Sequence, residues 1–167
     1  MSLIDEIAEI ESEIFSDAWS AELLRDSFRY DYNHYMVVTA DGELISGSDR
    51  TDEADGEMIP GSSSTEKTDA EAGDGEGNIA GYIIYSESDV FELQRIAVRE
   101  SERRKGLADR LMKALLEAVD GRVILEVRSK NVPAIGLYNK YGFNKIGVRK
   151  EYYSDPVDDA VIMELVR

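Results

Sequence analysis

The sequence contains no cysteine, so it offers no thiolate nucleophile, no thiolate metal ligand and no disulfide. This absence is compatible with a reducing compartment, and we expect a cytoplasmic protein. No apolar run approaches the roughly 18 to 20 residues that cross a bilayer, and the first residues, MSLIDEIAEIESEIF, are too acidic for a secretory signal. His34 is the only histidine and lies outside the motifs described below. We interpret it as structural and expect no bound metal.

Basic residues are scarce as well. The chain has 19 Lys and Arg against 35 Asp and Glu, a formal net charge of −16. Nucleic-acid binding needs a basic face that neutralises phosphates, so we expect no nucleic-acid partner and, for the same reason, no membrane partner. An acidic surface favours a basic substrate through electrostatic steering.

Half of the net charge lies in one segment, 46–77, which carries ten acids against Arg50 and Lys67. Glycine, serine, threonine and acids dominate it, so it buries too little apolar surface to offset its ordering entropy. We expect one domain over 1–167 with a mobile acidic loop inserted at 46–77; a folded acidic subdomain is the alternative. The flanks HYMVVTADG and NIAGYIIYSE are strand-like. The simplest arrangement is a β-hairpin whose turn is replaced by this insertion.

The remaining chain alternates between helical and strand patterns. We expect helices over 4–15, after a cap at Ser20, over 107–119 and over 134–140, and strands over 90–98, 122–127, 143–150 and 159–166. This order predicts a mixed α/β fold with one central sheet.

The stretch RRKGLADRLM, 103–112, places three cations and Gly106 directly before a helical pattern. The first N–H groups of a helix have no intrahelical partners, and the helix dipole favours negative charge there. The stretch therefore suits a phosphate or pyrophosphate. A basic, solvated turn capped by glycine would give the same pattern.

The stretch LEVRSKNVPAIGLYNKYGF, 125–143, holds three further candidates. Glu126 lies in a mostly apolar strand, where burial would raise its pKa and make it a usable base; the alternative is a surface residue paired with Arg128. Tyr138 on the following helix could donate a phenolic proton, or could be a core tyrosine. Asn131 precedes Pro133, where capping of the helix is the simple explanation.

Together, LQRIAV, RRKGLADRLM, LEVRSKNVPAIGLYNKYGF and RKEYYSDPVDDAVIM resemble the GNAT superfamily of acetyl-CoA-dependent N-acetyltransferases. The resemblance is closest to the ribosomal-protein-alanine N-acetyltransferase (RimI) family, and FSDAWSAELLRDSF resembles that family's Phe-Pro-Trp-Ser region. It implies the GNAT fold, a central mixed, mostly antiparallel sheet flanked by helices. Acetyl-CoA would lie in the V between the fourth and fifth strands.

The resemblance also implies roles for individual residues. Glu126 matches the family's general base, Tyr138 its general acid, and Tyr152 and Tyr153 the tyrosines of its peptide cleft. The positions that match acetyl-CoA-binding residues are Ile96, Ala97, Val98, Arg103, Arg104, Lys105, Gly106, Leu107, Ala108, Asp109 and Asn131. Ala108 replaces a residue that is often glycine, an accepted variant. The strand that precedes the first helix in the family is missing or very short here, which would leave a sheet edge exposed.

The implied function is transfer of an acetyl group from acetyl-CoA to the N-terminal α-amine of a protein, with a ribosomal-protein alanine as the expected target. The amine attacks the thioester directly. An α-amine has a reference pKa of about 7.7 to 8.0, against about 10.4 for lysine, so it deprotonates more easily near neutral pH. The alternatives are acetylation of a lysine side chain or small amine, and a non-catalytic coenzyme A-binding module.

Overall fold

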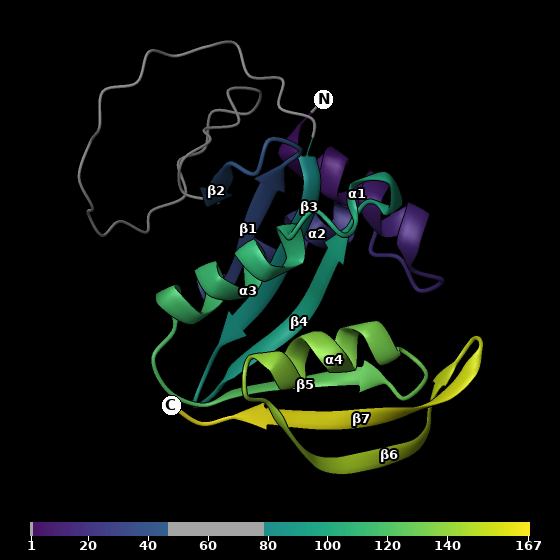
Figure 1. Cartoon of the computed structure of the whole chain (residues 1–167). Helices are drawn as coiled ribbons and strands as arrows, with labels where there is room; N and C mark the ends of the chain where they lie inside the picture. Colours follow the sequence, from purple (N-terminus) through teal and green to yellow (C-terminus); the bar gives the residue numbers. More distant parts are fainter. Residues whose placement is uncertain (1, 47–78) are drawn as a thin grey trace.

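A seven-stranded sheet runs through the protein in the computed structural model, which describes residues 2–46 and 79–167 (Figure 1). The strand order is β2-β1-β3-β4-β5-β7-β6. The strands are β1 (Asn33–Thr39), β2 (Leu44–Ser46), β3 (Ile79–Glu87), β4 (Phe91–Val98), β5 (Val123–Arg128), β6 (Asn144–Ser154) and β7 (Val157–Leu165). Only β4 and β5 pair in parallel, and every other neighbouring pair is antiparallel. The predicted mixed, mostly antiparallel sheet is confirmed.

In the described part of the chain, four α-helices and one 3₁₀ turn surround the sheet. They are α1 (Leu3–Ile14), α2 (Ala21–Ser27), η1 (Glu100–Glu102), α3 (Leu107–Ala118) and α4 (Val132–Lys140). Side-chain oxygens of Ser2, Ser20 and Asn131 accept backbone N–H groups at the starts of α1, α2 and α4. These caps satisfy donors that have no partner within the helix, and they fix where each helix begins. The predicted helices, including the cap at Ser20, are confirmed.

The sheet separates two apolar cores. One core joins α3 and α4 to β3, β4, β5 and β7, with Leu111, Met112 and Leu115 fully buried. The other joins α1 and α2 to β1, β3 and β4, with Ile7 and Ile10 fully buried. The two helix pairs therefore lie on opposite faces, and β4 contributes to both cores.

The two strands that flank the acidic insertion, β1 and β3, pair antiparallel as predicted. The sequence did not predict β2, which follows β1 in the chain and pairs along its other edge. The end of β2 at Ser46 and the start of β3 at Ile79 therefore lie on opposite sides of β1. Ser46 ends β2, and the remainder of the predicted loop, 47–77, lies outside the described residues.

Within the described residues, the first element is α1, whose cap is Ser2. The three-residue strand β2 forms the sheet edge at this end. A short edge strand presents few unpaired backbone groups to another chain.

Candidate active site

The parallel strands β4 and β5 separate halfway along their length (Figure 1). Only Phe91, Glu92 and Leu93 of β4 have partners on β5. Beyond them, 96–98 pairs only with β3 and 126–128 only with β7. The register of β3 and β4 shifts at this point, and a β-bulge bends its strand. The backbone of 96–98 consequently faces the opening on the side where β5 has turned away.

The N-terminus of α3 lies beside this opening. Gly106 caps the helix with φ 80°, a left-handed conformation that favours glycine, and no side chain caps the first turn. A small cavity of ≈ 130 Å³ forms here, and its lining includes Val98, Glu102, Gly106 and Ala108. A Cβ added at Gly106 would meet no atom within 4 Å. Open space against uncapped helical N–H groups is the arrangement that an anion requires.

The charged side chains of this loop are partly engaged with the protein itself. Arg103 donates from Nε to the Val98 carbonyl oxygen at 3.2 Å, and Lys105 pairs with Glu102 at 2.8 Å. Asp109 turns toward α4, where the hydrogen bond from Lys140 holds the pKa of the Asp109 carboxyl below its usual value. Asp109 can therefore serve an anion only through its backbone.

Glu126 lies on the sheet face opposite α3 and α4, with its side chain 22% exposed. Its carboxylate pairs with Nε of Arg149 on β6 at 3.1 Å. The predicted apolar burial is thus wrong, because alternate residues of β5 face opposite sides of the sheet and only Leu125 and Val127 enter the core. The alternative partner, Arg128, is wrong as well, since Arg128 binds the β6–β7 turn.

Tyr138 is 5% exposed and packs against Phe143, with ring centroids 5.8 Å apart. Burial, with a contribution from nearby Tyr153, raises the pKa of the Tyr138 phenol well above its usual value. The phenol therefore keeps its proton at neutral pH. Tyr138 is therefore a core residue, as one of its two interpretations expected, and its interaction with Tyr153 leaves the role of proton donor as a prediction.

Tyr152 and Tyr153 of β6 are the two tyrosines that match the family's peptide cleft. The negative charge of Glu126 raises the pKa of Tyr152, and burial followed by that same charge raises the pKa of Tyr153. Arg128 stacks 4.2 Å from the Tyr153 ring centroid. The structure thus brings Glu126, Tyr152 and Tyr153 together from β5 and β6, and Tyr138 of α4 lies near this cluster through Tyr153.

Asn131 and His34 make contacts that stabilise local structure. The side-chain oxygen of Asn131 accepts the Ala134 N–H at 3.2 Å, so Asn131 caps α4. His34 stacks on Tyr85 at 5.0 Å, consistent with a structural role. Across residues 2–46 and 79–167, no three His, Cys, Asp or Glu side chains gather to hold a metal, and no described helix is long and apolar enough to cross a membrane.

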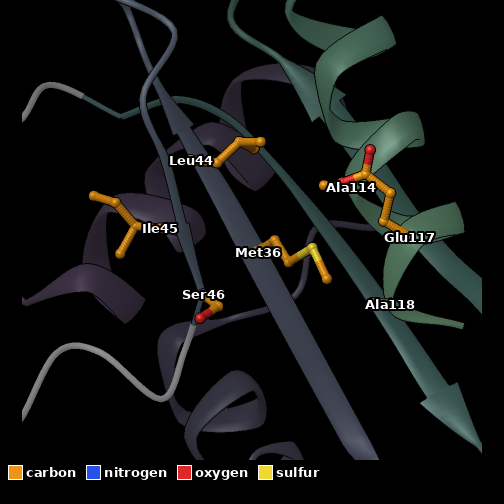
Figure 2. Close-up of a pocket in the computed structure, with 7 residues that line it drawn as sticks. All are labelled: Met36, Leu44, Ile45, Ser46, Ala114, Glu117 and Ala118. Atoms are coloured by element: carbon orange, nitrogen blue, oxygen red, sulfur yellow. The ribbon is translucent and has the colours of Figure 1, made fainter. Parts of the chain in front are cut away.

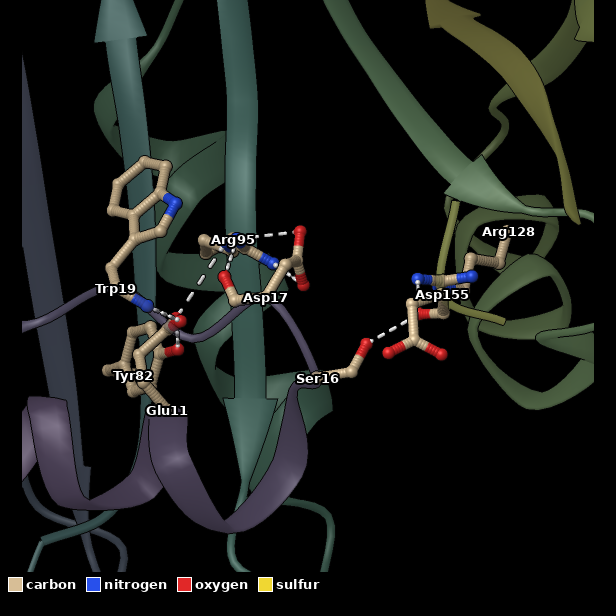
Figure 3. Close-up of polar contacts among 8 residues, drawn as sticks. All are labelled: Glu11, Ser16, Asp17, Trp19, Tyr82, Arg95, Arg128 and Asp155. Atoms are coloured by element: carbon tan, nitrogen blue, oxygen red, sulfur yellow. Dashed lines mark hydrogen bonds and ion pairs between the residues drawn. The ribbon is translucent and has the colours of Figure 1, made fainter. Parts of the chain in front are cut away.

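Sequence patterns did not reveal a buried polar network beneath the opening (Figure 3). Glu11 of α1 is fully buried; its carboxylate accepts the Tyr82 hydroxyl and, at 2.8 Å, the Trp19 backbone N–H. Arg95 of β4 lies 3.8 Å from the same carboxylate and 3.3 Å from Asp17. Such buried carboxylates need several partners. The network fixes the α1–α2 connection against β3 and β4.

The same connection touches the β6–β7 turn (Figure 3). The Ser16 hydroxyl donates to the Asp155 carbonyl oxygen at 2.7 Å, and Arg128 donates to the same oxygen at 2.9 Å. These partners are 139 and 27 residues apart in sequence, which explains why no local pattern indicated them. Two loops from opposite ends of the chain thus meet beside the tyrosines.

A second hollow of ≈ 350 Å³ lies between β2 and the end of α3 (Figure 2). Its lining includes Met36, Leu44, Ala114 and Ala118, and none of the predicted site residues contributes to it. It is therefore separate from the opening between β4 and β5.

Comparison with known proteins identifies the family. The model of the acetyltransferase (GNAT) family matches residues 60–143. A Bacillus subtilis protein assigned provisionally as a [ribosomal protein bS18]-alanine N-acetyltransferase is 30% identical over 96% of this chain and 87% of its own length.

Solved structures show the same fold. The ribosomal-protein-S18-alanine N-acetyltransferase of Escherichia coli superposes with a TM-score of 0.70 at 23% identity, covering 99% of this chain and 90% of that one. A GNAT family acetyltransferase from Elizabethkingia anophelis with acetyl-CoA bound gives 0.51 at 19% identity, over 55% and 71% of the two chains. With the matching family model and the extended similarity to the Bacillus protein, the chain belongs to the GNAT acetyltransferase family.

Proposed function

We propose that the protein transfers the acetyl group of acetyl-CoA to the N-terminal α-amine of a protein, with a ribosomal-protein alanine as the first target to test. The observation that carries this proposal is the cluster of Glu126, Tyr152 and Tyr153 beside the point where β4 and β5 separate, with the buried Tyr138 phenol near Tyr153. An amine that enters there meets a carboxylate and a buried phenol. The names of the Bacillus and Escherichia relatives support the choice of acceptor.

Acetyl-CoA would bind along the opening. The first turn of α3 and the loop 103–109 fit its pyrophosphate, because uncapped N–H groups, Gly106 and a cavity coincide there. The backbone of 96–98 faces the opening and would hold the pantetheine arm. Asn131 uses its side-chain oxygen as a cap, so only its amide nitrogen would contact the cofactor.

The chemistry then needs only groups that are already present. The neutral amine attacks the thioester carbon, forming a C–N bond as the C–S bond breaks. Glu126 accepts the proton that the amine loses, through a water molecule, and Tyr138 donates its phenolic proton to the departing thiolate. A backbone N–H of 96–98 stabilises the transient oxyanion.

The exposed face around Glu126 suits an extended peptide. Tyr152 is 50% exposed and forms a T-shaped pair with Tyr153 at 5.1 Å, so the two rings offer a surface rather than a closed pocket. A lysine side chain or a small amine remains the second candidate, because the same carboxylate and phenol would serve any amine. The lower reference pKa of an α-amine favours the first candidate near neutral pH.

We also propose that 1–167 forms one catalytic domain and that, with a ribosomal-protein acceptor, it acts in the cytoplasm. Neither nucleic acid nor a membrane is required for this function.

The test is incubation of the purified protein with acetyl-CoA and a panel of peptides, analysed by mass spectrometry. The panel contains ribosomal-protein N-termini, the same peptides with a blocked N-terminus and one lysine, and small polyamines. The proposal requires a mass gain of one acetyl group at the free N-terminus and little at lysine. Acetylation confined to lysine or to polyamines would support the second candidate, and no acetylation of any acceptor would indicate a binding module.

A further inference from the structure

Arg149 has no role in the mechanism described above, yet it forms the only ion pair recorded for Glu126 within the described residues. Its guanidinium also lies 5.5 Å from the centroid of the Tyr152 ring. A cation is thus held between a carboxylate and an aromatic face. Those two groups are the ones that a protonated amine would seek on arriving at the opening.

Arg149 cannot itself take part in proton transfer, because a guanidinium keeps its proton at any ordinary pH. It can, however, be moved. Its side chain is 56% exposed, and ion pairs at such exposure are weak. The contrast with Arg95 is informative: Arg95 is 13% exposed and is enclosed by Glu11, Asp17 and two aromatic rings.

We propose that Arg149 is a displaceable stand-in for the acceptor amine. In the free protein its guanidinium occupies the place beside Glu126 and Tyr152 that the substrate's ammonium group takes when the peptide binds. This inference rests on the proposed role of Glu126 as the base. Arg149 thereby competes with the substrate's ammonium group for Glu126 and takes no part in the chemical step.

The sheet supplies a matched control. Arg122 forms the same type of ion pair with Glu164, from the neighbouring strand β7, and its side chain is 48% exposed. Glu164 lies opposite Ile124 on β5, so this pair occupies the other end of the strand from Glu126. Replacing Arg122 removes an equal charge of similar exposure without touching the opening.

The experiment measures steady-state kinetics with a peptide of the panel that has a free N-terminus and accepts an acetyl group. It compares the wild type with Arg149→Ala, Arg149→Gln, Arg149→Lys and Arg122→Ala. Loss of a competing cation of this exposure should lower the KM for peptide roughly 2- to 5-fold in both neutral Arg149 variants. The kcat and the KM for acetyl-CoA should change little. Arg149→Lys keeps the competing charge and should resemble the wild type, as should Arg122→Ala.

A second measurement tests whether Arg149 acts through its ion pair with Glu126. Peptide affinity is determined by calorimetry in the presence of coenzyme A, in a Glu126→Gln background with and without Arg149→Ala. If Arg149 acts through Glu126, its removal should no longer improve affinity there. An unchanged or raised KM in the neutral variants would overturn the inference, and so would an equal gain in both backgrounds. Acetylation of lysine alone by the wild type would contradict only the proposed function, and the Arg149 comparison would then use that acceptor.

Discussion

At the scale of single residues, Glu126 and Tyr138 have opposite environments. Glu126 is partly exposed and faces a cation, whereas Tyr138 is almost fully buried and has a raised pKa. A partly exposed carboxylate can exchange protons with water, as a base must after each turnover. A buried phenol with a raised pKa keeps its proton at neutral pH, so it is present in the form that can donate a proton.

This contrast gives the first prediction. Glu126→Gln should lower kcat by about 10² to 10⁴-fold near neutral pH, the range typical of a lost general base. The rate should recover partly at high pH, where the amine loses its proton unaided. Tyr138→Phe should lower kcat with no recovery at high pH. The measurement is a pH–rate profile of each variant beside its coenzyme A affinity; a near-normal neutral-pH rate for Glu126→Gln would refute the assignment of the base.

Gly106 gives the second prediction. Gly106→Val should weaken coenzyme A binding about tenfold or more, because a side chain would stand where the pyrophosphate reaches the helix. Since a Cβ there meets no protein atom, the fold should survive with only the strain of a left-handed backbone, about 1 to 2 kcal/mol.

Gly121 is the control for that strain. It has φ 128° and open space around its Cβ position, but it lies after α3, outside the cavity at the helix start. Gly121→Val should reduce the melting temperature to a similar extent and leave coenzyme A affinity unchanged. If calorimetry gave the same coenzyme A affinity for both variants, the assignment of pyrophosphate binding to this loop would be wrong.

At the scale of elements, the bulge in β6 decides where Arg149 and Tyr152 point. Glu151 has φ 49°, and the register of β6 against β7 shifts between Arg149 and Tyr153. Asp159 of β7 accepts the Glu151 N–H at 2.9 Å and the Lys150 ammonium at 2.7 Å. A strained residue of this kind persists only where neighbours hold it.

The third prediction follows from this contact. Asp159→Ala should raise the KM for peptide and lower kcat, because Tyr152 loses its fixed position beside Glu126, while coenzyme A affinity stays unchanged. Lys150→Ala removes the ion pair and keeps the backbone contact, so its effect should be much smaller. Steady-state kinetics of the two variants would separate the contributions, and equal effects would contradict the importance of the backbone contact.

The pH dependence of this contact has a definite sign. The hydrogen bond from Lys150, followed by that from Glu151, holds the pKa of Asp159 below its usual value. A carboxyl with a lowered folded-state pKa stabilises the fold above its unfolded pKa, and that contribution is lost as the pH falls through the folded value. The melting temperature of the wild type should therefore begin to fall as the pH drops below the reference pKa of aspartate, about 3.9, and continue to fall through the lowered pKa of Asp159. The Asp159→Ala variant should lack this step.

Local patterns predicted the helices, their caps and most strands, because apolar periodicity and capping residues act within a few positions. These patterns also placed the loop 103–106 before α3, Glu126 on β5 and Tyr138 on α4. They did not predict β2, the pairing of Glu126 with Arg149, or the burial of Glu11. Each of these depends on strand order and on which face a side chain takes, and those are set by contacts between distant parts of the chain.

At the scale of the whole molecule, the positions of β2 and β3 set the distance that a connection between them must span. β2 and β3 flank β1 on opposite sides, with Ser46 opposite Met36 and Ile79 opposite Thr39. The two strand ends are therefore about 10 Å apart across the sheet and about 10 Å apart along it, from the usual strand spacing and rise. A two-residue turn cannot span this, but a linker of about ten residues reaches up to about 33 Å and can pass around β1.

The last prediction uses this geometry. Replacing 47–78 with ten Gly and Ser residues should keep the melting temperature near that of the wild type, because the removed segment is acidic and nearly free of apolar residues. Replacing it with Asn-Gly should destabilise the protein, since either β2 or the start of β3 must detach from β1. The ten-residue variant also loses eight of the sixteen net negative charges. Its activity on basic peptides should therefore fall at low ionic strength and match the wild type at high salt, where steering is screened. A large loss of thermal stability in the ten-residue variant would show instead that the insertion packs against the fold.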